Sequence, residues 1–305
     1  MRRFLLGRLV SSALVILAVS VAAFGLLRFS GDLALEYAGE NASAEEIARV
    51  SEELGLDRAL PVQYGVWAAS ALRGDLGKSI YTGEPVAELL RAPFALTGTI
   101  AAWSLLFALL VSVPLGSLSA LRRGTTLDVV ALALVTLGQA IPSFLLAIVL
   151  AAIFGVWLGW LPVSGSQSAR HLVLPIASMS LAIVPALLRM VRTSMLEVLR
   201  SDYVEMARAK GLGTARVLAV HALPNVSLPL IALASVQFGQ LLAGSVVIEH
   251  VFALDGVGRL ALASIERIDF PVVQGVVLVL GCVYVILTIL ADLFGMIIDP
   301  RLRPA

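Results

Sequence analysis

This chain contains few charged residues and almost no cysteine. Asp, Glu, Lys and Arg make up 14% of its 305 residues, against about 25% in an ordinary soluble domain, and 59% of the residues are hydrophobic. This composition excludes a water-soluble globule and predicts a protein of the lipid bilayer. The one cysteine, Cys282, lies within an apolar run, so the fold cannot depend on an internal disulfide.

Sequence signals for nucleic-acid binding, metal binding and catalysis are also missing. The formal net charge is +1, and no basic run interleaved with aromatic residues occurs, so we expect no nucleic-acid partner. Four acids crowd one segment near His250, namely Glu249, Asp255, Glu266 and Asp269. Their spacing fits no closed ligand set. We therefore predict no metal site and no catalytic residue, and expect these acids to form a solvated rim that touches a partner.

A phosphate-binding loop is absent despite one partial match. Gly77-Lys78-Ser79 ends like a P-loop, but that motif needs a glycine five residues before Gly77, and Leu72 stands there. We expect the chain to bind neither ATP nor any other cofactor itself.

Six long apolar runs are present, and each is long enough to cross a bilayer, which takes about 20 residues in a helix. They cover roughly residues 9–29, 95–119, 128–158, 172–191, 226–248 and 272–297. The first run follows Met1-Arg2-Arg3 like a secretory signal, but it continues to Phe29, which favours an uncleaved anchor. The runs predict an all-α, polytopic membrane protein with six transmembrane helices.

Basic residues in the short loops predict the orientation. With the amino terminus inside, thirteen of the 22 Lys and Arg residues fall in cytoplasmic segments, and five of the others lie in one long loop where such counting is weak. We expect both termini in the cytoplasm. The expected parts are a first transmembrane helix (1–30), an extracytoplasmic domain (31–94), a five-helix core (95–298) and a cytoplasmic tail (299–305). Within the domain, Ser43 and Glu46 have the spacing of a capping box that begins a helix.

A short charged loop, residues 201–224, interrupts the core on its cytoplasmic side. Asp202 is expected to cap a helix with Glu205 in its first turn, Gly211 to end that helix in the left-handed conformation, and Thr214 to cap a second one. The pattern predicts helix, glycine turn, helix. Its mixture of charged and apolar residues suits either docking to a protein partner or an amphipathic loop resting on anionic lipid headgroups.

This loop resembles the EAA motif of binding-protein-dependent ABC importer permeases. Glu205, Ala207, Gly211, Leu223 and Pro224 stand at matching positions, whereas the first alanine is replaced by methionine and the usual isoleucine by histidine, at positions 206 and 221. In that family the short helix inserts into a cleft on a cytoplasmic ATPase subunit. The resemblance implies that ATPase coupling involves Asp202, Tyr203, Glu205, Ala207, Arg208, Lys210, Gly211, Leu223 and Pro224.

The resemblance extends over nearly the whole chain and narrows to permeases of the peptide/opine/nickel group with the larger external domain. The similar segments are residues 54–86, Gly138 to Pro142, Glu249 to Gly275, and Asp299-Pro300-Arg301. One departure is Gly31-Asp32-Leu33, where the group usually has Gly-Asp-Pro.

Membership of this group would imply a type I ABC importer permease fold in the bacterial cytoplasmic (inner) membrane. It would also imply a heterodimer with a second permease, two ATPase subunits that bind ATP and Mg, and an external binding protein. Peptides are the expected substrate, with nickel chelates or another small solute as the alternative. An ion-coupled secondary transporter and a membrane scaffold are further alternatives.

Polar side chains within the runs are candidates for the substrate path, because exposing them to lipid is costly. The candidates are Gln139, Ser143, Gln237, Gln240 and Ser245. Hydrogen bonding between helices is the alternative role.

Two further sets of charged residues receive predicted roles. Asp292 is expected to pair with Arg189 or Arg192 and lock the inner ends of two helices, rather than to relay protons. The candidates for contact with the external binding protein are Glu249, Asp255, Arg259 and Asp269.

Overall fold

The computed structural model describes residues 2–29, 33–39, 42–53 and 55–298. These residues form helices joined by turns and loops. The predictions for Gly31, Asp32 and the tail 299–305 lie outside these residues. The chain forms two compact units. The terminal unit comprises residues 2–96 and 256–286, and the central unit comprises residues 97–255 together with the end of the last helix.

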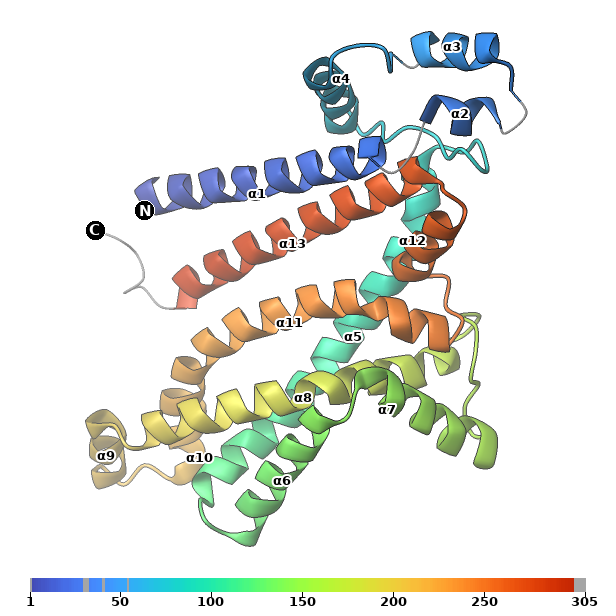
Figure 1. Ribbon diagram of the computed structural model, residues 1–305. Coiled ribbons are helices and arrows are strands. Elements are labelled where there is room, and N and C mark those ends of the chain that lie inside the picture. Colours follow the sequence, from blue (N-terminus) through green and yellow to red (C-terminus); the bar gives the residue numbers. More distant parts are fainter. Residues whose placement is uncertain (1, 30–32, 40–41, 54, 299–305) are drawn as a thin grey trace. The chain divides into compact units, whose positions relative to one another are not determined.

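The terminal unit contains the first helix, several short helices and parts of two long ones (Figure 1). Its elements are α1 (Arg2–Phe29), α2 (Leu33–Ala38), α3 (Ala44–Glu53), α4 (Leu60–Leu72), the start of α5 (Val86–Leu121), α12 (Val257–Glu266) and the start of α13 (Phe270–Ile298). Val86 and Leu90 of α5 form a core with Val257 of α12 and with Val272 and Val276 of α13. Glycine permits two close approaches within this unit: a Cβ at position 275 would lie 2.6 Å from Val86, and one at 281 would lie 2.7 Å from Val19 of α1.

The predicted capping box at the start of α3 is confirmed. The backbone N–H of Ser43 donates to Glu46 Oε2 at 2.8 Å, and the N–H of Glu46 donates to Ser43 Oγ at 3.3 Å. These reciprocal bonds satisfy two N–H groups that the first turn of a helix leaves free. α3 therefore begins at Ala44, as the sequence predicts.

The central unit holds most of the membrane-spanning helices. Its elements are the rest of α5, α6 (Thr126–Ala140), α7 (Ser143–Leu150), the π-helix η1 (Ala151–Trp157), α8 (Ala169–Leu199), α9 (Asp202–Ala209), α10 (Thr214–Arg216), the π-helix η2 (Val217–Ala222), α11 (Leu223–Val251) and the end of α13. α8 contacts α6, α7 and α11, and lies among them in Figure 1.

Small residues allow α8 to approach its neighbours closely. A Cβ at Gly116 of α5 would lie 2.9 Å from the Val191 side chain and 3.0 Å from the Leu188 carbonyl oxygen. A Cβ at Gly138 of α6 would lie 2.9 Å from Pro185. Lipid supplies no hydrophobic drive between helices, so close packing at small residues contributes much of their association.

Five helices of the described residues are long and apolar enough to cross a membrane, and a bent pair makes a sixth candidate. The third apolar run is not one straight helix. It bends by 101° between α6 and α7, where Ile141 is extended and Pro142 precedes the first residue of α7. Proline disfavours helical backbone at the residue before it, which explains why α6 ends there.

The second spanning helix begins at Val86, earlier than the apolar run that starts near residue 95. Glu88 and Arg91 lower the hydropathy of its first turns, yet Val86 and Leu90 are buried. The expected start of this helix is therefore corrected toward the amino terminus.

Candidate functional site

The loop between α8 and α11 forms a compact support with an exposed outer face. Val204 and Ala207 of α9 are buried and pack with Val217 of η2, against Val198, Leu199 and Leu212. Tyr203 and Met206 on the other side of α9 are 43% and 59% exposed. Glu205, Arg208 and Lys210 are exposed as well. The helix thus presents apolar and charged side chains together on one free face.

The end of α9 confirms the predicted role of Gly211, whose φ is +82°. The N–H of Leu212 donates to the carbonyl of Ala207 at 3.2 Å, and the N–H of Gly211 donates to that of Arg208 at 2.9 Å. These two bonds define a Schellman motif, and Leu212 also packs against the buried side of α9. The turn ends α9 and sets the direction in which the chain continues toward α10.

The predicted caps at Asp202 and Thr214 are wrong by one residue. Ser201 and Gly213 hold the extended backbone that precedes each helix, and Asp202 and Thr214 are the first helical residues. Asp202 and Glu205 still lie in the first turn of α9, where acids favour the positive end of the helix.

The second helix of the loop leads without a break into α11. α10, η2 and α11 follow one another from Thr214 to Val251. Leu223 packs in a cluster with Val191 and Met195 of α8, and Pro224 lies in the first turn of α11. Pro224 has no N–H to donate, and it directly follows the π-helical segment η2 and Leu223.

A buried ion pair joins three helices of the central unit. Arg192 of α8 donates to both carboxylate oxygens of Asp128 of α6, at 2.7 Å from Nε and 2.9 Å from Nη2. Ser119 of α5 donates to Asp128 Oδ1 at 2.5 Å, and the N–H of Gly124 donates to Oδ2 at 2.9 Å. Four donors thus surround one carboxylate whose side chain is 5% exposed.

This pair gives Arg192 a partner that the sequence did not predict. Arg192 contacts Asp128, and Arg189 donates to Gln139 Oε1 at 2.7 Å. The side chain of Asp292 lies outside the described residues. Sequence reasoning missed Asp128 because an acid in the first turn of a helix has a local explanation in the helix dipole.

The candidate path residues all lie in the central unit but differ in exposure. Gln139, Ser143 and Gln240 are exposed, whereas Gln237 and Ser245 are buried. Gln139 lies at the end of α6 and Ser143 begins α7, so both flank the 101° bend. Ser245 donates to Glu249 Oε1 at 2.8 Å.

Two of the four predicted binding-protein contacts are not on the surface. Glu249 is 1% exposed and accepts from Thr97 at 2.7 Å. Asp269 is 4% exposed; it accepts from the Ser79 hydroxyl, and from the N–H of Ile80 at 3.1 Å. The prediction of a solvated rim is thus wrong for these two acids. Both are buried, and hydroxyl and amide groups distant in sequence donate hydrogen bonds to them. Asp255 and Arg259 are exposed, as contact would require.

No group of three or more His, Cys, Asp or Glu side chains within the described part of the chain is arranged to hold a metal ion. The geometry offers an exposed helix on a rigid support and several apolar spanning helices, one of them sharply bent. These features define a polytopic helical membrane protein with a short exposed helix between two of its spans.

Comparison with known proteins identifies the family. Residues 112–304 match the model of the binding-protein-dependent transport system inner membrane component, and residues 1–101 match the model of its amino-terminal part. The chain belongs to this family and is an ABC importer permease, a multi-pass protein of the inner membrane.

Relatives of known name align over almost the entire chain. It is 36% identical to a probable peptide ABC transporter permease of Sinorhizobium fredii, covering 98% of this chain and 99% of the relative. It is 35% identical to a glutathione transport system permease, GsiC, of Salmonella choleraesuis, covering 99% of both.

A solved structure supports the fold. The MetNI methionine ABC transporter, in an inward-facing conformation, matches with a TM-score of 0.59 and 22% identity, over 71% of this chain and 99% of that one.

Proposed function

We propose that this chain is one half of the membrane pore of an ATP-driven peptide importer. The proposal rests on the structure of α9. Val204 and Ala207 are buried on one side of this helix, Gly211 ends it in the left-handed conformation, and the side chains on its other side are exposed. The names of the relatives, which refer to peptide and to glutathione, itself a small peptide, support peptides over nickel chelates.

ATP hydrolysis is assigned to two separate cytoplasmic subunits, which would bind ATP and Mg, because the chain lacks a phosphate-binding loop. Their docking site is the free face of α9, with Tyr203, Met206 and Arg208 as contacts. This assignment places α9 and both termini in the cytoplasm, and residues 33–72 outside. A second permease subunit completes the pore.

Transport proceeds by alternating access. ATP binding draws the two ATPase subunits together, and α9 moves with them. Because α9, η2 and the end of α8 share one apolar cluster, this motion reaches the spanning helices as a shift of packed elements. The size of the shift is limited by the difference in binding energy that ATP and the loaded binding protein have for the two states.

The substrate path runs beside the bend of the third span. Gln139 and Ser143 flank this bend, and Gln240 is the exposed glutamine of α11. Asp255 and Arg259 remain the candidate contacts of the external binding protein.

Uptake by the reconstituted complex tests the proposal. Proteoliposomes holding both permeases and the ATPase subunits, with binding protein outside and ATP inside, are offered a labelled dipeptide, labelled glutathione or radioactive nickel. ATP-dependent uptake of a peptide is expected. Uptake of nickel alone would contradict the substrate class, and uptake driven by an ion gradient without ATP would contradict the mechanism.

A further inference from the structure

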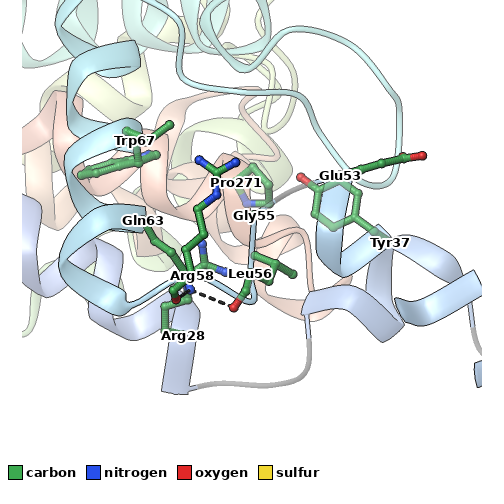
Figure 2. Close-up of a pocket in the computed structure, with 10 residues that line it drawn as sticks. Arg28, Tyr37, Glu53, Gly55, Leu56, Arg58, Gln63, Trp67 and Pro271 are labelled. Atoms are coloured by element: carbon green, nitrogen blue, oxygen red, sulfur yellow. Dashed lines mark hydrogen bonds between the residues drawn. The ribbon is translucent and has the colours of Figure 1, made fainter. Parts of the chain in front are cut away.

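Two neighbouring cavities lie at the end of α1 in the terminal unit, and they share Arg28. The larger, which we call the polar cavity, has a volume of about 410 Å³, and its lining includes Arg28, Tyr37, Glu53, Arg58, Gln63 and Trp67. The smaller, the apolar groove, has a volume of about 300 Å³ and is lined by Val21, Phe24, Gly25, Leu60, Pro61 and Tyr64 besides Arg28. Figure 2 shows the polar side chains gathered from α1, α2, α3 and α4 and from the turn before α4.

Two buried polar atoms of side chains that line the polar cavity have no hydrogen-bond partner among the described residues. They are Nε of Arg28 and Oε1 of Gln63. The Gln63 side chain is 8% exposed and is held in place, since its Nε2 donates to the carbonyls of Leu56 and Arg58 at 2.9 and 2.7 Å. Leaving a buried donor or acceptor unpaired costs free energy. The cavity is therefore suited to a ligand that both accepts and donates hydrogen bonds.

Positive charge dominates this cavity. Arg28 and Arg58 contribute two cations and Glu53 one carboxylate. The Arg28 guanidinium lies 5.2 Å from the centre of the Phe24 ring, which orients it beside the groove. Arginine binds phosphate oxygens with paired, directed hydrogen bonds.

Aromatic contacts form the wall of the apolar groove. Phe24 of α1 packs edge-on against Tyr64 of α4, with ring centres 5.5 Å apart, and Tyr64 also shares a 2.8 Å hydrogen bond with Ser20. α4 continues this apolar surface outward, because Leu60, Val62 and Val66 are 50%, 49% and 55% exposed. Such a helix is suited to the boundary between headgroups and acyl chains.

The position of Arg28 along α1 gives the depth of the site. Arg28 directly follows Leu26 and Leu27, near the carboxyl end of the first apolar run. From there its long side chain reaches the level of phospholipid phosphates.

We propose that the two cavities together bind one phospholipid. Its phosphodiester lies in the polar cavity between Arg28 and Arg58, and one acyl chain follows the apolar groove between α1 and α4. Glu53 and Gln63 accept hydrogen bonds from the headgroup, which favours the primary ammonium of ethanolamine over a quaternary amine. Inorganic phosphate or a peptide carboxylate would engage the arginines but leave the apolar groove empty.

Lipid retention by the intact transport complex tests this site. The complex is exchanged into nanodiscs of phosphatidylethanolamine or phosphatidylcholine, released into detergent, and its bound lipids are counted by native mass spectrometry. Arg28→Gln removes a phosphate contact, and Gly25→Leu fills the groove without changing charge. Arg73→Gln and Gly7→Leu are matched controls, since Arg73 lies outside both cavities and a Cβ at Gly7 meets nothing within 4 Å.

We expect one phosphatidylethanolamine to remain on the wild type and on both controls, and retention to fall about tenfold in Arg28→Gln and Gly25→Leu. Glycerophosphate at millimolar concentration should not displace it. Equal retention in all variants, or equal retention of phosphatidylcholine, would overturn the proposal. Displacement by glycerophosphate would indicate a phosphate site instead, and displacement by a dipeptide a peptide site.

Discussion

At the scale of single residues, Asp128 contributes most to the organisation of the central unit. Its carboxylate receives donors from α5, the following turn and α8, so one side chain holds the α5–α6 connection against the helix that leads into α9. A buried carboxylate with four donors is well satisfied, and removal of the carboxylate leaves all of these donors without the charge they contact.

Asp128→Ala should destabilise the protein by up to about 3 kcal/mol, because it leaves the partly buried Arg192 charge without its carboxylate. Replacing both residues, with Asp128→Leu and Arg192→Met, should recover most of this loss. Thermal unfolding of the purified complex in detergent gives the comparison. A double variant no more stable than Asp128→Ala would show that the ion pair is not the source of the effect.

Gly211 is the residue on which the direction of α9 depends. Gly211→Val should cost roughly 1–2 kcal/mol, because a side chain at φ +82° meets its own backbone. We expect fewer ATPase subunits to copurify and peptide uptake to fall. Gly213→Ala is the control, since Gly213 has φ −64° and open space around it. Equal losses in both variants would contradict a specific role for the left-handed turn.

At the scale of elements, α8 is the central helix of its unit, and its neighbours approach it at glycines. Gly116→Ala should destabilise the protein by about 1 to 3 kcal/mol, because the new methyl would collide with Val191 and the Leu188 carbonyl. Gly98→Ala in the same helix meets nothing within 4 Å and should be neutral or stabilising by up to about 1 kcal/mol. The test compares the unfolding temperatures of the two variants. Similar values would argue against a close helix crossing at Gly116.

The capping box makes the start of α3 sensitive to acid. The backbone N–H of Ser43, and then its hydroxyl, bond to the Glu46 carboxylate and lower its pKa below the usual value of about 4.3. The box therefore contributes fully above that pH, and its contribution is lost as the pH falls through the lowered pKa. Amide protection factors in α3, which correct for the intrinsic slowing of exchange in acid, should fall at acid pH in the wild type, whereas those of Glu46→Gln should be lower already at pH 6. Glu45→Gln, on the same turn, should behave like the wild type.

Local signals in the sequence were sufficient to predict the capping box of α3 and the glycine turn after α9. Ser43 and Glu46 are three residues apart, and Gly211 directly follows the polar end of α9, so neighbouring residues determine both structures. The bend of the third span was harder to predict, because Pro142 indicates a break but its 101° angle depends on packing against α8 and α11.

Contacts between distant residues could not be predicted. Arg192 and Asp128 are 64 residues apart, and Glu249 is buried by Thr97, which is 152 residues away. Nothing near Glu249 in the sequence distinguishes a carboxylate that accepts buried hydroxyls from one in water. The expected rim was wrong for Glu249 and Asp269 for this reason, whereas Asp255 and Glu266 are exposed.

At the scale of the whole molecule, the chain is a membrane subunit in which small apolar clusters join α9 to the spanning helices of the central unit. Val204, Ala207 and Val217 attach α9 to η2 and to the end of α8. Val191 and Met195 of α8 pack with Ala222 of η2 and Val226 of α11. A force applied to the face of α9 would therefore reach two spanning helices directly. This continuity supports the proposal that the energy for transport enters through α9.

Cross-linking from α9 tests this central claim most directly. Cys282, the only native cysteine, is replaced by serine, and Met206→Cys places a single thiol on the free face of α9. In the assembled complex we expect this thiol to cross-link to an ATPase subunit, with a yield that changes when ATP is added. Labelling of the same thiol by a membrane-impermeant reagent from outside the cell, while peptide uptake continues, would contradict the account.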